Sequence, residues 1–258
     1  MGALRSGTRV LLVLDFDGTL TPIVRRPDAA RLHPAVRQTL RRLAADRRVR
    51  LAIVSGRSLA DLRRRVGLPG IVYGGCHGLE LRGPALRYTH PGARSARARL
   101  RAAAARLAAG LGGYPGARLE PKGCALAVHY RGVPSRAVRR LRRVVGRVAR
   151  EARLGILPGK RVWDLVPPGR RGKAPALRRL LREFRAPAGG RRVLTLYAGD
   201  DATDADVFRA LGPRILGVQV GGRRGLAAYR LPGVPALHTL LRRLADTVEG
   251  VPRLRPSR

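Results

Sequence analysis

Short, continuous apolar runs recur in this chain, and a helical pattern follows each of them. The first three runs are Val10–Leu14, Leu51–Val54 and Ile71–Tyr73. Pro34–Ala45 and Leu59–Val66, which lie between them, carry apolar residues at helical spacing. Apolar runs without polar alternation are typical of strands that are buried on both faces. The order strand, helix, strand therefore predicts an α/β fold with a doubly wound, parallel, Rossmann-like sheet.

The middle of the chain has a different pattern. Two long helices rich in Ala and Arg, Ser95–Leu111 and Ser135–Ala152, alternate with short strand-like runs, and Gly/Pro breaks bracket the block. The strand–helix alternation resumes after the block. We therefore expect residues 1–84 and 168–258 to form a catalytic core, and residues 85–167 to form an inserted α+β lid.

Charge is the unusual feature of the composition. The formal net charge is +38, and only three of the 54 basic residues are lysines. The arginines are scattered over nearly every predicted helix, aromatic residues make up only 4%, and no zinc-finger, helix-turn-helix or RNP pattern occurs. We therefore expect no specific nucleic-acid partner, although non-specific binding to polyanions is expected at low salt.

The sequence carries no pattern for a secretion signal or a membrane helix. Its first apolar run, Val10–Leu14, is too short for either and ends in acidic residues. The two cysteines, Cys76 and Cys124, form neither a CxxC pair nor a metal-binding spacing. We therefore expect a cytoplasmic protein without a membrane partner, and the sequence leaves the oligomeric state open.

Acidic residues gather in two short segments. The chain has 16 acidic residues, and six of them lie in DFDGT and GDDATDAD, namely Asp15, Asp17, Asp200, Asp201, Asp204 and Asp206. Each segment directly follows an apolar strand pattern, as does Ser55. Because the carboxyl ends of parallel strands lie at one edge of a sheet, these side chains are expected to share a crevice.

Such a crevice suits phosphate chemistry. Carboxylate oxygens are the ligands that a hard cation such as Mg²⁺ takes, usually together with substrate phosphate and water. A carboxylate that attacks an anionic phosphate meets a repulsion of about 4 kcal/mol per charge pair at about 4 Å and an effective dielectric of ~20. A cation and a lysine beside the phosphate would cancel that repulsion. A turn or a helix cap would explain a lone DxD equally well, but not two acidic segments that follow strands together with Ser55 and Lys173.

These motifs resemble those of the haloacid dehalogenase-like phosphatases. The matching segments are Asp15-Phe16-Asp17-Gly18-Thr19-Leu20 for the first motif, Ser55 for the second, Lys173 for the third and Gly199-Asp200-Asp201-x-Thr203-Asp204 for the fourth.

The resemblance implies a role for each matched residue. Asp15 would be the nucleophile and Asp17 the general acid and base, with Gly18 permitting the backbone turn. Mg²⁺ would be held by Asp15, the Asp17 carbonyl and Asp200. Ser55 and Lys173 would hold the transferring phosphoryl group.

Further segments are similar to those of trehalose-6-phosphate phosphatases. They are Ser55-Gly56-Arg57, Gly75-x-His77-Gly78-x-Glu80, Glu120-x-Lys122-Gly123 and Val128-His129-Tyr130-Arg131. The resemblance implies a sugar-phosphate substrate, with sugar contacts from the lid at Glu120, Lys122, Arg131 and Asp164. Carboxylates would accept hydrogen bonds from sugar hydroxyls, and Lys and Arg would donate them.

Two departures from this family pattern keep other substrates open. Lys173 follows Gly172 where Lys-Gly is usual, and Asp164 stands where a longer glutamate is usual. The alternatives are sucrose phosphate, a phosphorylated glycerate glycoside or, in another class, a polyanion-binding protein on the same fold.

Single residues receive separate predictions. In a chain that otherwise uses arginine, Lys122 and Lys173 suggest a need for a compact point charge, whereas Lys160 is interpreted as a chance survivor. Arg57 is predicted to contact substrate, and His77 is as readily a structural residue as a ligand. The remaining predictions are that Asp201 lines the site without binding metal, that Asp204 caps the following helix and supports the site, and that Trp163 is a packing residue.

Overall fold

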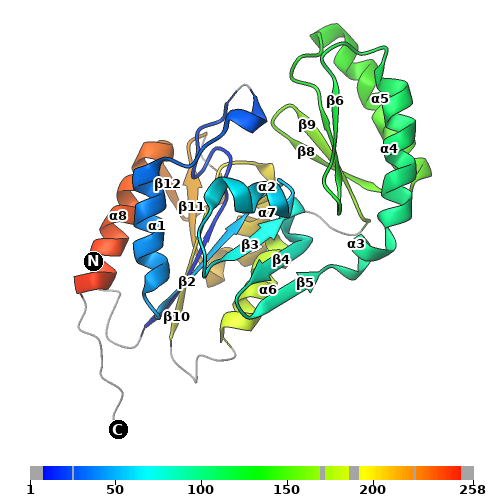
Figure 1. Ribbon diagram of the computed structural model, residues 1–258. Helices are drawn as coiled ribbons and strands as arrows, with labels where there is room; N and C mark the ends of the chain where they lie inside the picture. The colour runs from blue at the N-terminus through cyan, green and yellow to red at the C-terminus, as the bar shows by residue number, and fades with distance from the viewer. Residues whose placement is uncertain (1–7, 25, 169–171, 186–191, 223–224, 251–258) are drawn as a thin grey trace.

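An eight-stranded sheet forms the larger part of the molecule (Figure 1). The computed structural model describes residues 8–24, 26–168, 172–185, 192–222 and 225–250. The strand order is β12-β11-β10-β1-β2-β3-β4-β5, in which β12 through β3 pair parallel and β4 and β5 form an antiparallel edge. The predicted α/β fold with a parallel sheet is confirmed. The strands are β1 (Arg9–Leu14), β2 (Val49–Val54), β3 (Val72–Gly75), β4 (Glu80–Gly83), β5 (Leu86–Thr89), β10 (Val193–Gly199), β11 (Leu216–Val220) and β12 (Tyr229–Leu231).

Helices cover both faces of this sheet. Because side chains alternate along a strand, β1 buries Leu12 and Leu14 in one apolar cluster and Leu11 and Val13 in another. This double burial explains why the strand reads as an unbroken apolar run. The first cluster includes residues of α1 (Pro34–Ala45), α2 (Leu59–Val66) and α8 (Val234–Gly250), and the second includes residues of α6 (Ala174–Arg185) and α7 (Ala202–Leu211).

The second sheet of the molecule has four strands, which pair antiparallel. Its strand order is β6-β7-β9-β8. In Figure 1 its long helices lie on the side that faces away from the large sheet, and their apolar residues pack on the small sheet. Trp163 is buried there and stacks on Tyr130 with ring centroids 4.0 Å apart, so Trp163 is a packing residue. The elements are β6 (Arg118–Pro121), β7 (Leu126–His129), β8 (Gly155–Gly159), β9 (Val162–Val166), α3 (Pro91–Ser95), α4 (Arg97–Leu111) and α5 (Ser135–Glu151).

The hairpin of β4 and β5 differs from the sequence prediction. Residues 85–89 are expected in the lid, but β5 pairs with β4 in the large sheet, because Pro84 and Ala85 form a hairpin turn directly after Gly83 and the chain does not leave the core there. The division of the chain into a core and an inserted lid stays a prediction.

Two further points concern the predicted lack of a membrane helix and the residues that the structure does not describe. Among the described residues, no helix combines the length and the apolar character needed to cross a membrane. Residues 169–171, which precede Gly172 and Lys173, and residues 251–258 lie outside the described residues.

Candidate active site

Three neighbouring strands deliver the central residues of the site. Asp15 directly follows β1, Ser55 follows β2 and Asp200 follows β10. Strands β10, β1 and β2 are adjacent and parallel, so their carboxyl ends lie at one edge of the large sheet. The structure therefore brings together the two acidic segments and Ser55, as the order of strands predicted.

A buried lysine neutralises part of the acidic cluster. Lys173, which immediately precedes α6, donates from Nζ to Asp15 Oδ1 at 2.5 Å and to Asp204 Oδ1 at 2.9 Å. All three side chains are buried. Burial raises the pKa of Asp15 well above its ordinary value of 3.8, because Lys173 does not fully offset burial and the nearby charges of Asp204 and Asp200. The site therefore holds more negative charge than its buried lysine balances.

Asp200 lies beside Asp15 because the chain turns sharply at Gly18. The φ angle of Gly18 is +88°, and a Cβ there would lie 2.0 Å from Oδ2 of Asp200. The Thr19 hydroxyl lies 3.2 Å from Oδ2 of Asp15 and 3.2 Å from Oδ1 of Asp200, and thus bridges the two carboxylates. Thr19 belongs to the first motif, but its place in the sequence predicted no role for it. Only glycine at position 18 leaves room for this arrangement.

Asp204 is a fully engaged carboxylate at the start of α7. Its Oδ1 accepts from Lys173 and from the Tyr197 hydroxyl at 2.5 Å, and its Oδ2 accepts from the backbone N–H groups of Asp200 and Asp201 at 3.0 Å each. Asp201 occupies the N-cap and accepts from the backbone N–H of Thr203 at 2.8 Å. The prediction that Asp204 itself is the cap was wrong, because Asp204 closes the capping box from the third helical position.

Asp17 points its carboxylate to Arg57. The Nε and Nη2 atoms of Arg57 each donate to Asp17 at 2.7 Å, and Nη1 donates to Asp61 at 2.7 Å. The guanidinium of Arg57 thus binds two carboxylates, and its contact with substrate stays a prediction. Asp61 was missed in the sequence because it lies in a helix that shows no motif. Arg57 therefore positions Asp17 at the edge of the site.

A cavity of about 610 Å³ opens over these groups. Residues of both sheets line it, so the small sheet faces the acidic cluster across the cavity. His77 and Arg57 are in its lining. So are all the lid residues that are expected to contact sugar, namely Glu120, Lys122, Arg131 and Asp164.

Glu120 and Arg131 lie on the lid side of this cavity. Glu120 Oε2 lies 2.7 Å from His129 Nε2. Although burial raises the pKa of Glu120, His129 and Lys122 outweigh burial and lower it from the ordinary value of 4.5. Arg131 donates to the Val24 carbonyl of the large-sheet side and to the Lys160 carbonyl at 3.2 Å. Glu120 is therefore an anionic acceptor, and Arg131 ties the small sheet to the loop after β1.

Lys160, interpreted in the sequence as a chance survivor, has a partner at the site. Lys160 lies in the turn between β8 and β9 and forms an ion pair with Asp200. The scarcity of lysine in an arginine-rich chain was the signal that could have identified it.

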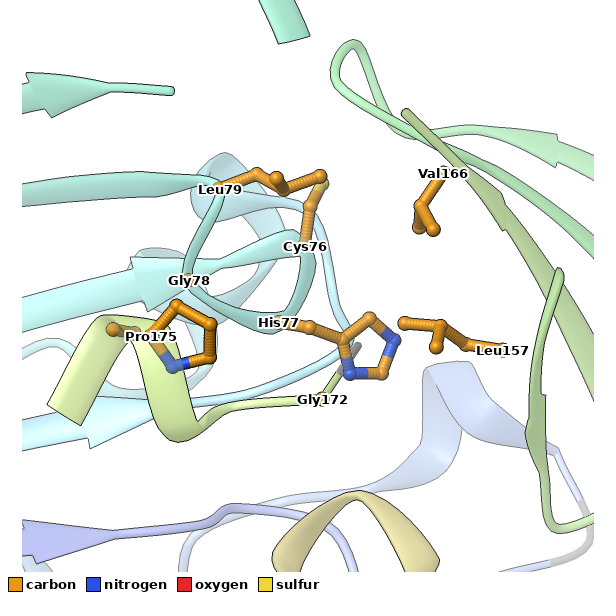
Figure 2. Close-up of a pocket in the computed structure, with 9 residues that line it drawn as sticks. Cys76, His77, Gly78, Leu79, Leu157, Val166, Gly172 and Pro175 are labelled. Atoms are coloured by element: carbon orange, nitrogen blue, oxygen red, sulfur yellow. The ribbon is translucent and has the colours of Figure 1, made fainter. Parts of the chain in front are cut away.

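Lys122 and Asp164 face a different part of the large sheet. Lys122 Nζ donates to Asp164 Oδ1 at 2.7 Å and to the Gly56 carbonyl at 2.7 Å, and His77 Nε2 lies 3.1 Å from Asp164 Oδ2. Figure 2 shows His77 extending from its turn toward Leu157 of the small sheet. The structure therefore brings these three predicted residues together as one buried cluster.

Comparisons with known proteins agree with this arrangement. The family model described as trehalose-phosphatase matches residues 13–224. The trehalose-phosphate phosphatase of Mycobacterium tuberculosis is 36% identical over 244 residues, which cover 92% of this chain and 62% of that protein. The chain thus spans about three fifths of the length of that relative.

Solved structures share the fold. A crystal structure of a trehalose-6-phosphate phosphatase related protein superposes with a TM-score of 0.78 at 25% identity, covering 92% of this chain and 97% of that chain. The C-terminal domain of the trehalose-6-phosphate phosphatase of C. albicans gives a TM-score of 0.80 at 24% identity, covering 93% of each chain. The family match over most of the sequence, together with this fold, leads to one conclusion: the chain belongs to the trehalose-phosphatase family.

Proposed function

We propose that this chain hydrolyses trehalose 6-phosphate to trehalose and phosphate through an aspartyl-phosphate on Asp15. The observation that carries the proposal is the buried Asp15–Lys173 pair at the floor of a cavity that both sheets line. An anionic nucleophile, a compact cation and room for a disaccharide phosphate are the parts that phosphoryl transfer needs. Membership of the trehalose-phosphatase family supports the same substrate class.

A divalent cation fits the carboxylates of the site. One oxygen each of Asp15, Asp200 and Asp204 lies within 4.8 Å of the others. Since all hydrogen-bonding directions of Asp204 are in use, we propose that Asp15 and Asp200, with the Asp17 carbonyl, hold Mg²⁺. When bound, the ion would neutralise charge on the phosphate and on the carboxylates. Burial first, and then the charges of Asp204 and Asp200, raise the pKa of Asp15, and a cation beside the carboxylate would favour its ionised form.

The protein groups divide the reaction into two steps. An oxygen of Asp15 forms a bond to phosphorus while the bond from phosphorus to the sugar oxygen breaks, and Asp17 gives that oxygen a proton. Asp17 then takes a proton from water, whose oxygen attacks the phosphorus and releases Asp15 and phosphate. Lys173 and Ser55 hold the phosphoryl oxygens. Because Arg57 binds both oxygens of Asp17 beforehand, Asp17 has to exchange this partner for the leaving group.

The sugar side of the cavity supports a polyhydroxyl substrate. Glu120 offers an anionic acceptor for hydroxyls, and His129 holds it in place. A phosphatase for another sugar phosphate, such as sucrose phosphate or a phosphorylated glycerate glycoside, is the second candidate. It is favoured by one observation, namely that Asp164 is already engaged by Lys122 and His77.

Phosphate release from a panel of sugar phosphates, with and without Mg²⁺, tests the function. Trehalose 6-phosphate is expected to lead the panel, and excess chelator should stop turnover. Asp15→Asn should abolish activity without unfolding the protein, whereas Asp246→Asn, at an exposed ion pair on α8, serves as the matched control and should remain active. Full activity of Asp15→Asn would refute the nucleophile, and another substrate in the lead would favour the second candidate.

The remaining partner predictions concern the surface. We propose a small-molecule partner only, with no specific nucleic acid and no membrane. Tight, salt-steep nucleic-acid binding without Mg²⁺-dependent phosphate release would favour the polyanion-binding alternative. A cytoplasmic location stays a prediction of the sequence.

A further inference from the structure

The two sheets meet at a compact joint beside the active site. Its apolar part is a separate cluster in which Cys76 and Leu79 of the large-sheet side pack with Cys124, Leu157 and Val166 of the small-sheet side. Figure 2 shows the Cys76–Leu79 turn opposite Leu157 and Val166. A set of buried polar contacts lies next to this small apolar cluster.

Asp164 is at the centre of those polar contacts. It lies on β9 with only 4% of its surface exposed, and each of its oxygens has one partner: Lys122 on Oδ1 and His77 on Oδ2. Lys122 also donates to the carbonyl of Gly56, next to Ser55. Asp164 therefore joins the small sheet to the large one directly through His77 and indirectly through Lys122.

The large-sheet side of the joint has a tightly fixed backbone. Cys76, His77 and Gly78 adopt φ angles of 49°, 58° and 85°, so three consecutive residues are left-handed. The turn is held by hydrogen bonds from Cys76 N to the Arg57 carbonyl at 2.7 Å and from His77 N to the Ser55 carbonyl at 2.8 Å. A strained backbone of this kind persists only where its surroundings fix it. His77 is thus presented at a defined place by the loop that carries Ser55.

The chemistry of the pair also fixes the histidine. The Asp164 carboxylate can only accept, so Nε2 of His77 donates the proton of their hydrogen bond. Nδ1 of His77 is buried without a hydrogen-bond partner among the described residues. Gly56 packs so closely on the ring that a Cβ there would lie 2.7 Å from it. The ring therefore has one polar partner in the described structure, and that partner is Asp164.

We infer that Asp164 is a positioning residue that fixes the small sheet over the Ser55 loop. The inference rests on the proposed phosphatase function for its kinetic consequence, but not for its structural one. Each Asp164 oxygen already has a partner inside the joint, and the residue is 4% exposed, so these contacts hold the carboxylate in place between the two sheets. The contact of Asp164 with His77 and Lys122 places Glu120 and Arg131, which belong to the small-sheet side, at the cavity.

The length of the side chain supports the same role. Asp164 fills a buried site with partners at 2.7 Å and 3.1 Å, so a longer glutamate would have to displace Lys122 or His77. For a sugar ligand the opposite holds, because a glutamate would reach further into the cavity. Asp164→Glu consequently distinguishes the two roles.

The distance between the sheets in the substrate-free protein is the direct test. Spin labels at Arg143→Cys on α5 and Arg182→Cys on α6, both exposed positions, report it by pulsed electron paramagnetic resonance. The native Cys76 and Cys124 are buried, and burial raises the pKa of both thiols, so labelling favours the introduced sites. Asp164→Ala and Asp164→Glu should shift and broaden the distances, whereas Glu151→Gln, at an exposed small-sheet ion pair, should reproduce the parent.

Kinetics supply the second readout. In Asp164→Ala, kcat/KM for trehalose 6-phosphate should fall about 10²-fold, as expected for misplaced binding groups, while p-nitrophenyl phosphate, which lacks the sugar, should change far less. If Asp164→Ala does not fold, His77→Asn replaces it, since asparagine tolerates the left-handed φ of 58°.

Parent-like distances in Asp164→Ala and Asp164→Glu would overturn the inference, and so would full sugar-phosphate activity of Asp164→Glu. If the parent protein hydrolyses no sugar phosphate, the proposed function fails while the distances still decide the role of Asp164.

Discussion

Replacing Lys173 by methionine removes the cation from the most buried charge cluster of the protein. Lys173 is 2% exposed, and its ammonium is the shared donor to Asp15 and Asp204, which are 3% and 0% exposed. Methionine keeps much of the aliphatic stem, so packing changes little. The two carboxylates are then left largely buried and without this counter-charge.

The structure sets the size of the effect. Because the carboxylate oxygens of Asp15 and Asp204 lie within 4.8 Å of one another, Coulomb's law at an effective dielectric of ~20 gives a repulsion of at least about 3.5 kcal/mol. Removing one partner of a buried ion pair typically costs about 3–5 kcal/mol. We therefore expect Lys173→Met to lower the free energy of unfolding by about 3–5 kcal/mol at about pH 8, and to abolish phosphatase activity.

The loss should depend on pH in a definite direction. Without Lys173 the pKa values of Asp15 and Asp204 rise further, so the folded state binds protons more tightly than the unfolded state. The contribution of such groups to stability falls as pH rises, and the difference between mutant and parent should therefore shrink from about pH 8 to about pH 5.

Urea denaturation of the metal-free protein at both pH values measures this prediction. Glu183→Gln, which breaks an exposed pair with Arg179 on the same helix, is the control and should lose less than about 0.5 kcal/mol. A loss below about 1 kcal/mol for Lys173→Met, the range of surface pairs, or a loss that does not change with pH, would refute the electrostatic reasoning.

Three further predictions address the neighbouring groups. Gly18→Ala places a Cβ 2.0 Å from Asp200 at a φ of +88°. Titration calorimetry should therefore show weaker Mg²⁺ binding, and the free energy of unfolding should fall by about 1–2 kcal/mol. An unchanged Mg²⁺ affinity would contradict this geometry. Asp201→Ala removes the N-cap of α7 and should lower stability by about 0.5–2 kcal/mol in thermal unfolding, a result that an unaltered melting curve would exclude. Burial raises the pKa of Asp164, but Lys122 and His77 outweigh burial and lower the pKa below its ordinary value of 3.8. The ionised carboxylate therefore loses its stabilising effect as the pH falls below that value. Asp164→Asn should make the stability depend less on pH in acid unfolding, and parallel profiles of mutant and parent would contradict this electrostatic role.

The positions at the sheet edge could be predicted because each of them follows an apolar run. A run such as Val10–Leu14 fixes a strand, and a parallel strand fixes the edge at which the next residue, Asp15, emerges. The same logic missed the β4–β5 hairpin, because two strands of four residues around Gly83-Pro84 look like a break in the sequence.

The hydrogen-bond partners of the site residues were harder to predict from the sequence than their positions in the fold. Arg57 follows Ser55 at a strand end, which indicates proximity to the site, but its choice of Asp17 and Asp61 depends on rotamers and on the packing of α2. The role of Asp201 as the cap of α7, one turn before Asp204, likewise depends on where the backbone leaves β10. Sequence spacing defines the neighbourhood of a residue, whereas the hydrogen-bond partner is decided by the fold.

Lysine usage connects the composition of the chain to its site. The chain has three lysines among 54 basic residues, and all three form ion pairs in the lining of this cavity or at its floor. Lys173 serves Asp15 and Asp204, Lys122 serves Asp164, and Lys160 serves Asp200. A lysine ammonium is a compact point charge, and Lys173 and Lys122 each donate to two separate oxygens within a small buried space. In a chain that otherwise uses arginine, the positions of the three lysines therefore mark the site independently of the acidic motifs.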